Sequence, residues 1–491
     1  MHAGGTLSYP LFACACLVYD TPYGPGMKTK RIASLRLVSG LKHMVGLDRA
    51  IAFTVLGRFW SALAGILTIL LIARYLTPRE QGYYYTFYSL VALQIVFELG
   101  FSFVILQLAA HERASLTFLP GGDVEGDAVA HSRLASVLQK AIRWYFAAGL
   151  LMALALIPAG FVFFRAHQSA GAAVAWRAPW CLLVMAAMLA FQVDPVFSFL
   201  EGCGFIAEVA QRRLTQAVLG SLLAWAALLS HHGLYSPAMV ILGQVGVGIA
   251  FLLSSRHRRL IAGLLFYPVR QHFVGWKREI WPFQWKIAIS WMCGYFIFQI
   301  FSPILFAYQG PVAAGQMGMS LNIATAIGSV TLAWMNTKSS PFGALVAKGR
   351  FAELDRLFFR TLWQSTVLLV IGATIFLFAL LVGERSFPGL ANRVLPAWAF
   401  SLLLVNTILN HIIVSQALYL RAHKQEPFLV PTIISALLIA SCTLFLGKNY
   451  GANAVTIGLV LQGILFAFPS ATYIFVTKRR AWHGVYHGAA A

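Results

Sequence analysis

Twelve continuously apolar runs constrain this sequence more than any other feature. A helix of about 20 apolar residues crosses the roughly 30 Å of hydrocarbon in a bilayer. The runs lie near 51–76, 83–110, 142–165, 179–200, 206–230, 236–255, 285–308, 315–337, 361–383, 393–420, 428–446 and 452–477. They do not alternate with polar residues, which disfavours an outer-membrane barrel. With 59% hydrophobic and 11% charged residues, the chain cannot bury its apolar surface in a water-soluble fold. We therefore predict an all-α integral membrane protein.

Basic residues fall mainly on one side of these runs. If the N-terminus is cytoplasmic, 29 of the 37 Lys and Arg lie on the cytoplasmic side and 6 on the other, with Arg58 and Arg74 inside the first run. Loops that stay in the cytoplasm carry such an excess, so both termini are predicted to be cytoplasmic. Cytoplasmic loops thus account for the excess of basic residues behind the net charge of +21, and nucleic acid is not an expected partner. The basic stretch 256–286 is instead expected to favour anionic membrane lipids.

The segments between the runs argue against an enzyme. External loops are predicted to be no longer than about fifteen residues, too short for a catalytic domain. No cluster combines an acid, a base and metal ligands, and the six cysteines lack metal-ligand spacing, so we predict no catalytic residue, metal or cofactor. The stretch 111–140 is predicted to be a surface loop with a short amphipathic helix.

A short pattern recurs after the first and seventh runs. The first copy is Tyr75, Pro78 and Gly82, and the second is Tyr308, Pro311 and Gly315, at a constant offset of 233 residues. An even number of spans separates the copies, which implies a parallel repeat about an axis along the membrane normal. We predict two six-helix lobes around a central cavity.

The predicted parts are a basic cytoplasmic segment 1–50, an N-lobe 51–255, a basic linker 256–284, a C-lobe 285–480 and a cytoplasmic tail 481–491. Met27, followed by basic residues, is typical of a cytoplasmic start, which leaves open whether residues 1–26 belong to the native chain.

The turn after the first run resembles a known family. The sequence from Ala73 to Gly82, ARYLTPREQG, is similar to a turn of the polysaccharide and oligosaccharide (Wzx-type, O-antigen) flippases of the multidrug/oligosaccharidyl-lipid/polysaccharide exporter superfamily. Three further elements resemble that family in the same order: Glu98–Phe101 (ELGF), Pro311–Gly315 (PVAAG) and Ser339–Gly343 (SSPFG). The resemblance covers residues 45–480. The loop between the second and third runs lacks the Gly-x-x-x-Asp-Arg run that a major-facilitator carrier is expected to show there.

The resemblance implies a transporter of the bacterial inner membrane. Its cargo would be an oligosaccharide on undecaprenyl pyrophosphate, moved from the cytoplasmic to the periplasmic leaflet by alternating access. Such flippases serve O-antigen lipopolysaccharide or exopolysaccharide biosynthesis, which makes the polysaccharide polymerase machinery a candidate partner. Two alternatives stay open: a cation-coupled multidrug exporter of the same fold, and an integral-membrane enzyme of glycan assembly.

Three cations are candidates for binding an anionic substrate. Arg58 lies about two turns inside the first run, where an unpaired charge costs at least about 2.5–3.5 kcal/mol. It either contacts pyrophosphate, or reaches lipid phosphates, or pairs with Glu98. Lys286 opens the seventh run and Lys338 closes the eighth, so each is either a substrate ligand or an interfacial anchor.

Two carboxylates inside the runs are candidates for coupling transport to H⁺ or Na⁺. Glu98 lies in the second run and Asp194 in the fourth. A buried carboxylate can take up a proton or hold a cation. Each also has a structural alternative, because Glu98 can be the counter-ion of Arg58, and Asp194 precedes Pro195 at a possible helix kink.

Overall fold

The computed structural model describes residues 49–167, 174–269, 272–386, 389, 392–423 and 427–488. Residues 1–48 of the predicted segment 1–50, Arg270 and the last three residues lie outside this part of the chain.

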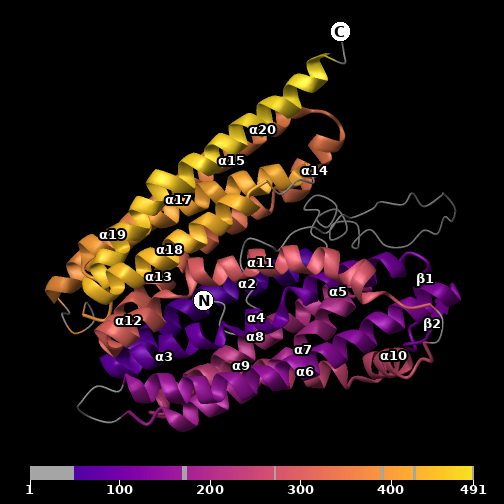
Figure 1. The fold of residues 1–491 in the computed structure, drawn as a ribbon, viewed down its shortest axis with the longest axis horizontal. Coiled ribbons are helices and arrows are strands. Elements are labelled where there is room, and N and C mark those ends of the chain that lie inside the picture. The colour runs from indigo at the N-terminus through magenta and orange to yellow at the C-terminus, as the bar shows by residue number, and fades with distance from the viewer. Residues whose placement is uncertain are drawn as a thin grey trace, which may run out of the picture.

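α-Helices form almost all of the described chain (Figure 1). The first half comprises α2 (Arg49–Tyr75), α3 (Pro78–Val91), α4 (Gln94–Glu98), α5 (Phe101–Arg113), α6 (Ala128–Ala166), α7 (Arg177–Gly202), α8 (Ile206–Leu229), the 3₁₀ turn η1 (Gly233–Tyr235), α9 (Ser236–Leu252) and α10 (Ser255–Leu265). The second half comprises the π-helix η2 (Trp276–Ile280), α11 (Trp281–Phe298), α12 (Phe301–Gln309), α13 (Pro311–Asn336), α14 (Ser339–Ala347), α15 (Phe351–Ser386), α17 (Ala397–Ala422), α18 (Leu429–Asn449), α19 (Ala452–Gln462), the π-helix η3 (Gly463–Ala467) and α20 (Phe468–Gly488).

These helices reproduce the predicted spans. Among the described residues, 9 helical segments are long and apolar enough to cross a membrane, and 2 bent helix pairs bring the number to 11. The remaining predicted run, 206–230, forms α8, which has 24 residues. The second run bends by 46° between Glu98 and Phe101, and the seventh bends by 42° between α11 and α12. The predicted all-α membrane fold is confirmed.

The stretch 111–140 differs from its prediction. Strands β1 (Leu116–Phe118) and β2 (Val124–Gly126) form an antiparallel hairpin in which Thr117 faces Glu125. The next helix, α6, then begins at Ala128 and runs on into the third span without a break. Its N-cap is Asp127, whose carboxylate accepts a hydrogen bond from the backbone N–H of Ala130. The predicted short helix is therefore the first part of a 39-residue helix rather than a separate element.

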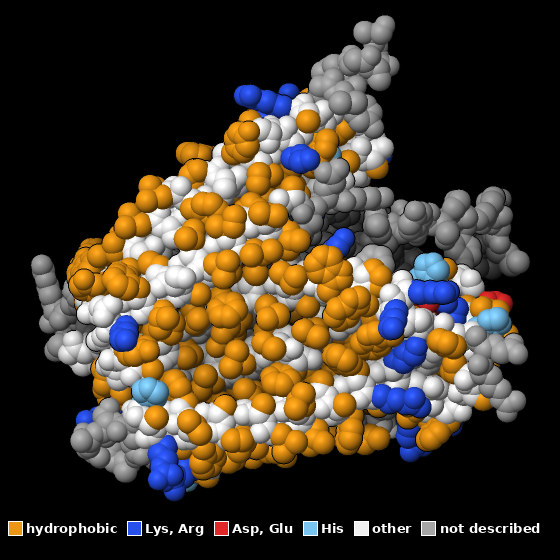
Figure 2. All heavy atoms as spheres, viewed as in Figure 1, with side chains coloured by type: hydrophobic (Ala, Val, Ile, Leu, Met, Phe, Trp, Pro, Cys, Tyr) orange, Lys and Arg blue, Asp and Glu red, His pale blue; other side chains and the backbone are white. Residues whose placement is uncertain are grey.

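The two halves form two lobes that meet at one end and diverge at the other. In Figure 1 they approach each other on the left, around α3, α12 and α13, and separate on the right, beyond α5 and α14. We call these the closed end and the open end. The contact at the closed end is made chiefly by α3 of the N-lobe and α13 of the C-lobe. In Figure 2 apolar side chains cover most of the visible face, and Lys and Arg gather near the open end of the N-lobe.

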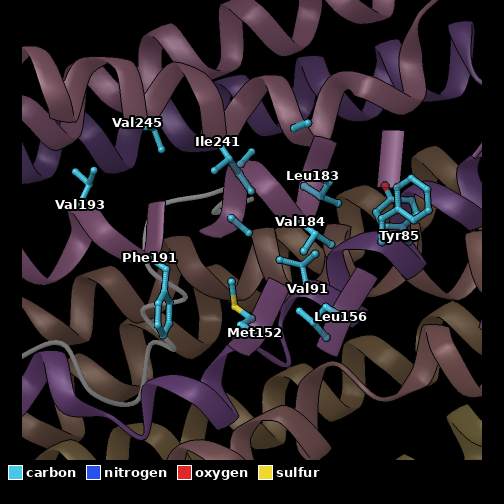
Figure 3. Close-up of a cluster of buried hydrophobic side chains, with 14 of the residues drawn as sticks. Tyr85, Val91, Met152, Leu156, Leu183, Val184, Phe191, Val193, Ile241 and Val245 are labelled. Atoms are coloured by element: carbon cyan, nitrogen blue, oxygen red, sulfur yellow. The ribbon is translucent and has the colours of Figure 1, made fainter. Parts of the chain in front are cut away.

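The N-lobe is held together by apolar side chains from α3, α6, α7 and α9. Figure 3 shows these side chains converging, with Val91, Met152, Val184 and Ile241 among those labelled. Met152 and Val184 have no exposed surface, and burying a side chain of this size stabilises a fold by about 1.5–3 kcal/mol. This packing fixes the positions of the helices that carry the polar groups of the N-lobe.

Candidate functional site

The two copies of the repeated turn begin the helices that close the molecule. Pro78 is the first residue of α3, and Thr77 caps that helix by accepting a hydrogen bond from the backbone N–H of Glu80 at 3.2 Å. In the second copy Pro311 begins α13 after Gly310, whose φ of 85° is in the left-handed region that favours glycine. Each turn therefore fixes the first residue of its helix, although by different capping chemistry.

Four residues into each helix, the glycines of the repeat bring the two backbones together. A Cβ on Gly82 would lie 1.9 Å from the carbonyl oxygen of Pro311, and a Cβ on Gly315 would lie 2.9 Å from the backbone nitrogen of Gly82. Both distances are below any real Cβ contact, and the opposing atoms are backbone. Only glycine fits at Gly82 while the lobes are in this arrangement.

Polar and aromatic contacts reinforce the closed end. The side-chain amide of Gln81 donates to the carbonyl oxygens of Gly315 at 2.9 Å and of Arg393 at 2.8 Å, both in the C-lobe. The rings of Tyr83 and Phe306 meet edge to face with centroids 4.9 Å apart, which joins α3 to α12. These contacts must break if the lobes separate at this end.

The bend in the second span places Glu98 at a helix end. Leu99 and Gly100 both have positive φ, 52° and 66°, and interrupt the helix between α4 and α5. Such backbone is strained for leucine and persists only where its surroundings hold it. The side chain of Ile287 from α11 occupies the space where a Cβ on Gly100 would lie, so the bend also serves as an interlobe contact.

Hydroxyl groups surround the Glu98 carboxylate. The hydroxyl of Ser102 donates to it, and Tyr145 on α6 lies with its hydroxyl 3.4 Å from the same carboxylate oxygen. The hydroxyl oxygens of Ser102 and Tyr145 are 2.8 Å apart and also share a hydrogen bond. Asp194 on α7 is close enough to Glu98 for the two negative charges to repel each other. We call Glu98, Ser102, Tyr145 and Asp194 the carboxylate cluster. The structure thus brings the two predicted coupling residues together, and adds two hydroxyls that sequence reasoning missed.

Arg58 does not join this cluster. The neighbouring Trp60 donates from its indole N–H to Ser221 on α8 at 3.0 Å, which fixes the side of α2 that faces the N-lobe. Arg58, two residues earlier, lies about 200° around the helix from Trp60. Its side chain is exposed, and it makes no ion pair with Glu98 or with any other carboxylate of the described residues. The counter-ion interpretation of Arg58 finds no support in this arrangement.

The other two predicted cations also lack carboxylate partners among the described residues. Lys286 is exposed near the start of α11, with its ammonium 5.7 Å from the ring centroid of Trp285. Lys338 is half-buried at the junction of α13 and α14. Arg58 on α2, Lys286 on α11 and Lys338 at the junction of α13 and α14 are therefore three positive charges without a carboxylate partner among the described residues.

The predicted linker is bound to the N-lobe rather than loose. Polar residues on the first part of α6 hold its backbone: Gln139 donates to the carbonyl oxygens of Leu264, Leu265 and Tyr267, Ser132 to that of His272, and Lys140 to that of Val274. Trp276 then packs on Trp144 with ring centroids 5.0 Å apart. Arg133 forms ion pairs with Glu112 at 2.8 Å and Glu279 at 2.5 Å, which joins α5, α6 and η2.

Metal-ligand geometry is not found in the described part of the chain, where no group of three or more His, Cys, Asp or Glu is placed to hold an ion. The polar groups that could bind a cation are those of the carboxylate cluster, which supplies two carboxylates and two hydroxyls.

No protein-family model and no curated protein sequence matches the chain. Solved structures do. An inward-facing multidrug-resistance MATE transporter of the MOP superfamily aligns with a TM-score of 0.61 at 14% identity, over 91% of this chain and 99% of that one. The chain has the fold of these transporters. The lipid II flippase MurJ, in an inward closed conformation, aligns with a TM-score of 0.55 at 12% identity, over 86% and 87%. A MOP-superfamily transporter from Pyrococcus furiosus, described as having a binding pocket of reversed polarity, gives 0.51 at 16% identity, over 91% and 99%.

Proposed function

We propose that this protein is a flippase that moves a lipid-linked oligosaccharide, carried on undecaprenyl pyrophosphate, from the cytoplasmic to the periplasmic leaflet. The observation that carries the proposal is the set of three cations, Arg58, Lys286 and Lys338, none of which is neutralised by a carboxylate of the described residues. A pyrophosphate entering a low-dielectric space needs fixed positive charge to offset its lost hydration. The carboxylates of the transmembrane region are instead withdrawn into the N-lobe, where hydroxyls surround Glu98.

The charge distribution supports one orientation of the molecule in the membrane. The segments at the open end carry most of the basic residues, which supports a cytoplasmic location for that end by the positive-inside rule. The arrangement is then the inward-facing state of an alternating-access cycle, in which the lobes rock about the repeat axis. Separation of Gly82 from Pro311 would open the periplasmic side. Both termini and the linker would remain cytoplasmic, in the bacterial inner membrane.

The carboxylate cluster is the proposed site for the coupling ion. A carboxylate with hydroxyl oxygens beside it, as Glu98 has, can take up a proton or bind Na⁺, and Asp194 lies within electrostatic range of it. The bend after Glu98 contacts α11 of the other lobe through Gly100 and Ile287. A change in the charge of the cluster can therefore alter this interlobe contact by moving the bend.

The test is reconstitution of the purified chain in proteoliposomes with a fluorescent undecaprenyl-pyrophosphate oligosaccharide. Transfer between leaflets is measured by the fraction of headgroup accessible to a glycosidase outside the vesicles. We expect transfer that depends on an ion gradient and falls at least tenfold in the variant in which Arg58, Lys286 and Lys338 are all replaced by Ala. No transfer by the wild-type chain, or full transfer by the triple variant, would count against the proposal.

A second candidate function is cation-coupled export of drugs. The observation that favours it is that Glu98 and Asp194 lie in the same lobe within electrostatic range of each other, because two such carboxylates can also bind a cationic drug or the ion that drives its export. The same proteoliposomes discriminate between the functions. Gradient-driven transport of ethidium that is lost in Glu98→Gln and unaffected by the triple cation variant would establish the exporter instead.

A further inference from the structure

A cavity of about 400 Å³ lies at the open end of the N-lobe, outside the proposed transport site. It is open to the surface and is lined by the end of α5, strand β1, the turn between α7 and α8 with the start of α8, and the start of α10. The tip of the hairpin fixes this assembly, because Gly122, with φ of 98°, packs so closely on α10 that a Cβ there would lie 2.6 Å from the carbonyl oxygen of Arg256.

Two arginines line the cavity with unused hydrogen-bonding capacity. The side chain of Arg113 makes no hydrogen bond or ion pair with the described residues. Its guanidinium carbon lies 2.3 Å from the position that a Cβ on Gly204 would take. Arg256 stacks over the ring of Phe205 at 5.1 Å, and its Nε is buried without a partner. A buried guanidinium N–H that lacks an acceptor carries a desolvation cost, which a bound anion would remove.

The charge of the cavity is positive in spite of one carboxylate. Glu208 lies 3.3 Å from Nη1 of Arg256 and 3.0 Å from Nε2 of His257. Burial lowers the pKa of His257 below its ordinary value, so the imidazole is neutral near pH 7 and the two arginines outweigh the single carboxylate. Arg212 lies close by, with its guanidinium 5.2 Å from the ring of Phe251 against which His257 also packs.

The depth of the cavity matches the lipid headgroups. Helix α7 has 26 residues from Arg177 to Gly202 and is therefore about 39 Å long, whereas the hydrocarbon layer is about 30 Å thick. With Arg177 at one interface, Gly204 lies beyond the hydrocarbon at the other. A phosphate group at this depth could belong to a phospholipid or to a small soluble phosphate ester.

We propose that the cavity binds a phosphate group between the guanidinium groups of Arg113 and Arg256. Arginine suits this role because its planar fork donates two hydrogen bonds to two oxygens of one phosphate. The site is separate from Arg58, Lys286 and Lys338, and holding a phosphate there would tie the hairpin to α10 and to the turn between α7 and α8.

The test uses the purified full chain in nanodiscs, with thermal unfolding followed by tryptophan fluorescence. Wild type is compared in phosphatidylcholine, in phosphatidylcholine with one quarter phosphatidylglycerol, and in phosphatidylcholine with glycerol 3-phosphate at constant ionic strength. We expect one of the two phosphate sources to raise the unfolding temperature by several degrees. A rise with phosphatidylglycerol alone assigns the site to a lipid headgroup, and a rise with glycerol 3-phosphate assigns it to a soluble ester. A rise with neither overturns the proposal.

The variants separate a binding site from general surface charge. Arg113→Ala and Arg256→Ala should lose most of the rise, and Arg113→Lys should lose part of it because lysine keeps the charge without the fork. Arg258→Ala is the matched control, since Arg258 is an exposed arginine of the same helix α10 that does not line the cavity. Glu208→Gln should enlarge the rise by removing the opposing charge. Equal losses in Arg258→Ala and Arg113→Ala, or a smaller rise in Glu208→Gln, would show that the arginines act only through surface charge or as a structural ion pair.

Discussion

Replacing Gly82 by alanine should open the closed end of the molecule. The new methyl group would lie 1.9 Å from the carbonyl oxygen of Pro311, whereas ordinary Cβ contacts begin beyond about 3 Å, so the two backbones must separate by more than 1 Å. No rotamer change can relieve the clash, because the opposing atoms belong to the backbone. Overpacking of this kind costs about 1–3 kcal/mol, which corresponds to a shift of roughly 5- to 150-fold away from the closed arrangement.

The measurement is the distance between the lobes at that end. Spin labels at Ser230, after α8, and Asn449, at the end of α18, occupy exposed positions on opposite lobes. In a background without other reactive cysteines, pulsed electron paramagnetic resonance should show a single short distance in the parent protein. Gly82→Ala should shift most of the distribution to longer distances. Gly315→Ala should have a smaller effect of the same sign, since its Cβ would lie 2.9 Å from the nearest atom.

Gly246→Ala is the matched control for this experiment. Gly246 is exposed in the middle of α9, and a Cβ there meets nothing within 4 Å. It gains the same helix propensity as any Gly→Ala change, about 1 kcal/mol, without the clash. A Gly82→Ala protein with the parent distance distribution and normal abundance would refute the reasoning, because it would show that the glycine contact does not hold the end closed.

Three further outcomes test other parts of the structure. Arg58→Ala should abolish transport at near-normal membrane abundance, and Arg58→Lys should restore only part of the transport. Because Arg58 does not contact Glu98, the double variant with Glu98→Ala should recover neither transport nor abundance. Surface polymer measures transport, and immunoblotting measures abundance. A disulfide between cysteines at positions Ser136 and Val274, whose side-chain oxygen and backbone nitrogen are 3.0 Å apart, should leave transport intact, and inhibition that is reversed by reductant would show that the linker must detach. The hydrogen bond from Arg133 lowers the pKa of Glu279 below its ordinary value of 4.5, so its contribution to stability is present above about pH 4.5 and is lost as the pH falls through the lowered value. Glu279→Gln should therefore reduce the loss of thermal stability between pH 7 and pH 3, measured by tryptophan fluorescence, and an unchanged pH profile would contradict this assignment.

The sequence was sufficient for the spans because their signal is strong and local. Runs of about 20 apolar residues have one common explanation, and the offset of 233 between Tyr75–Gly82 and Tyr308–Gly315 predicted two related lobes. What it could not supply was the partner of each turn. The contact between Gly82 and Pro311 depends on how the two lobes are oriented. The glycine pattern in the sequence is equally consistent with two turns that do not touch.

The missed elements have weak or ambiguous signals. The strands of the hairpin have three residues each, too few for an alternating pattern to be recognised. The residues that bind the linker, such as Gln139, donate to backbone carbonyl oxygens, and every residue carries such an acceptor. The proximity of Glu98 and Asp194 likewise depends on the packing of α5 against α7, which two isolated carboxylates in the sequence do not reveal.

The docking of the linker has a consequence for how the lobes can move. Because α6 holds the backbone as far as Val274, and Trp276 packs on Trp144, this stretch belongs mechanically to the N-lobe. The π-helix η2, in which a wider turn replaces the regular α-helical hydrogen bonds, is bound to the N-lobe as well, because Glu279 forms an ion pair with Arg133. The connection between the lobes then begins where η2 meets α11. Beyond it, α11 and α12 meet at a 42° bend, so the first span of the C-lobe has two places where its direction can change. Closure of the open end therefore requires adjustment of a few residues at the start of α11, and the predicted tolerance of a disulfide between linker and α6 follows from this division of the chain.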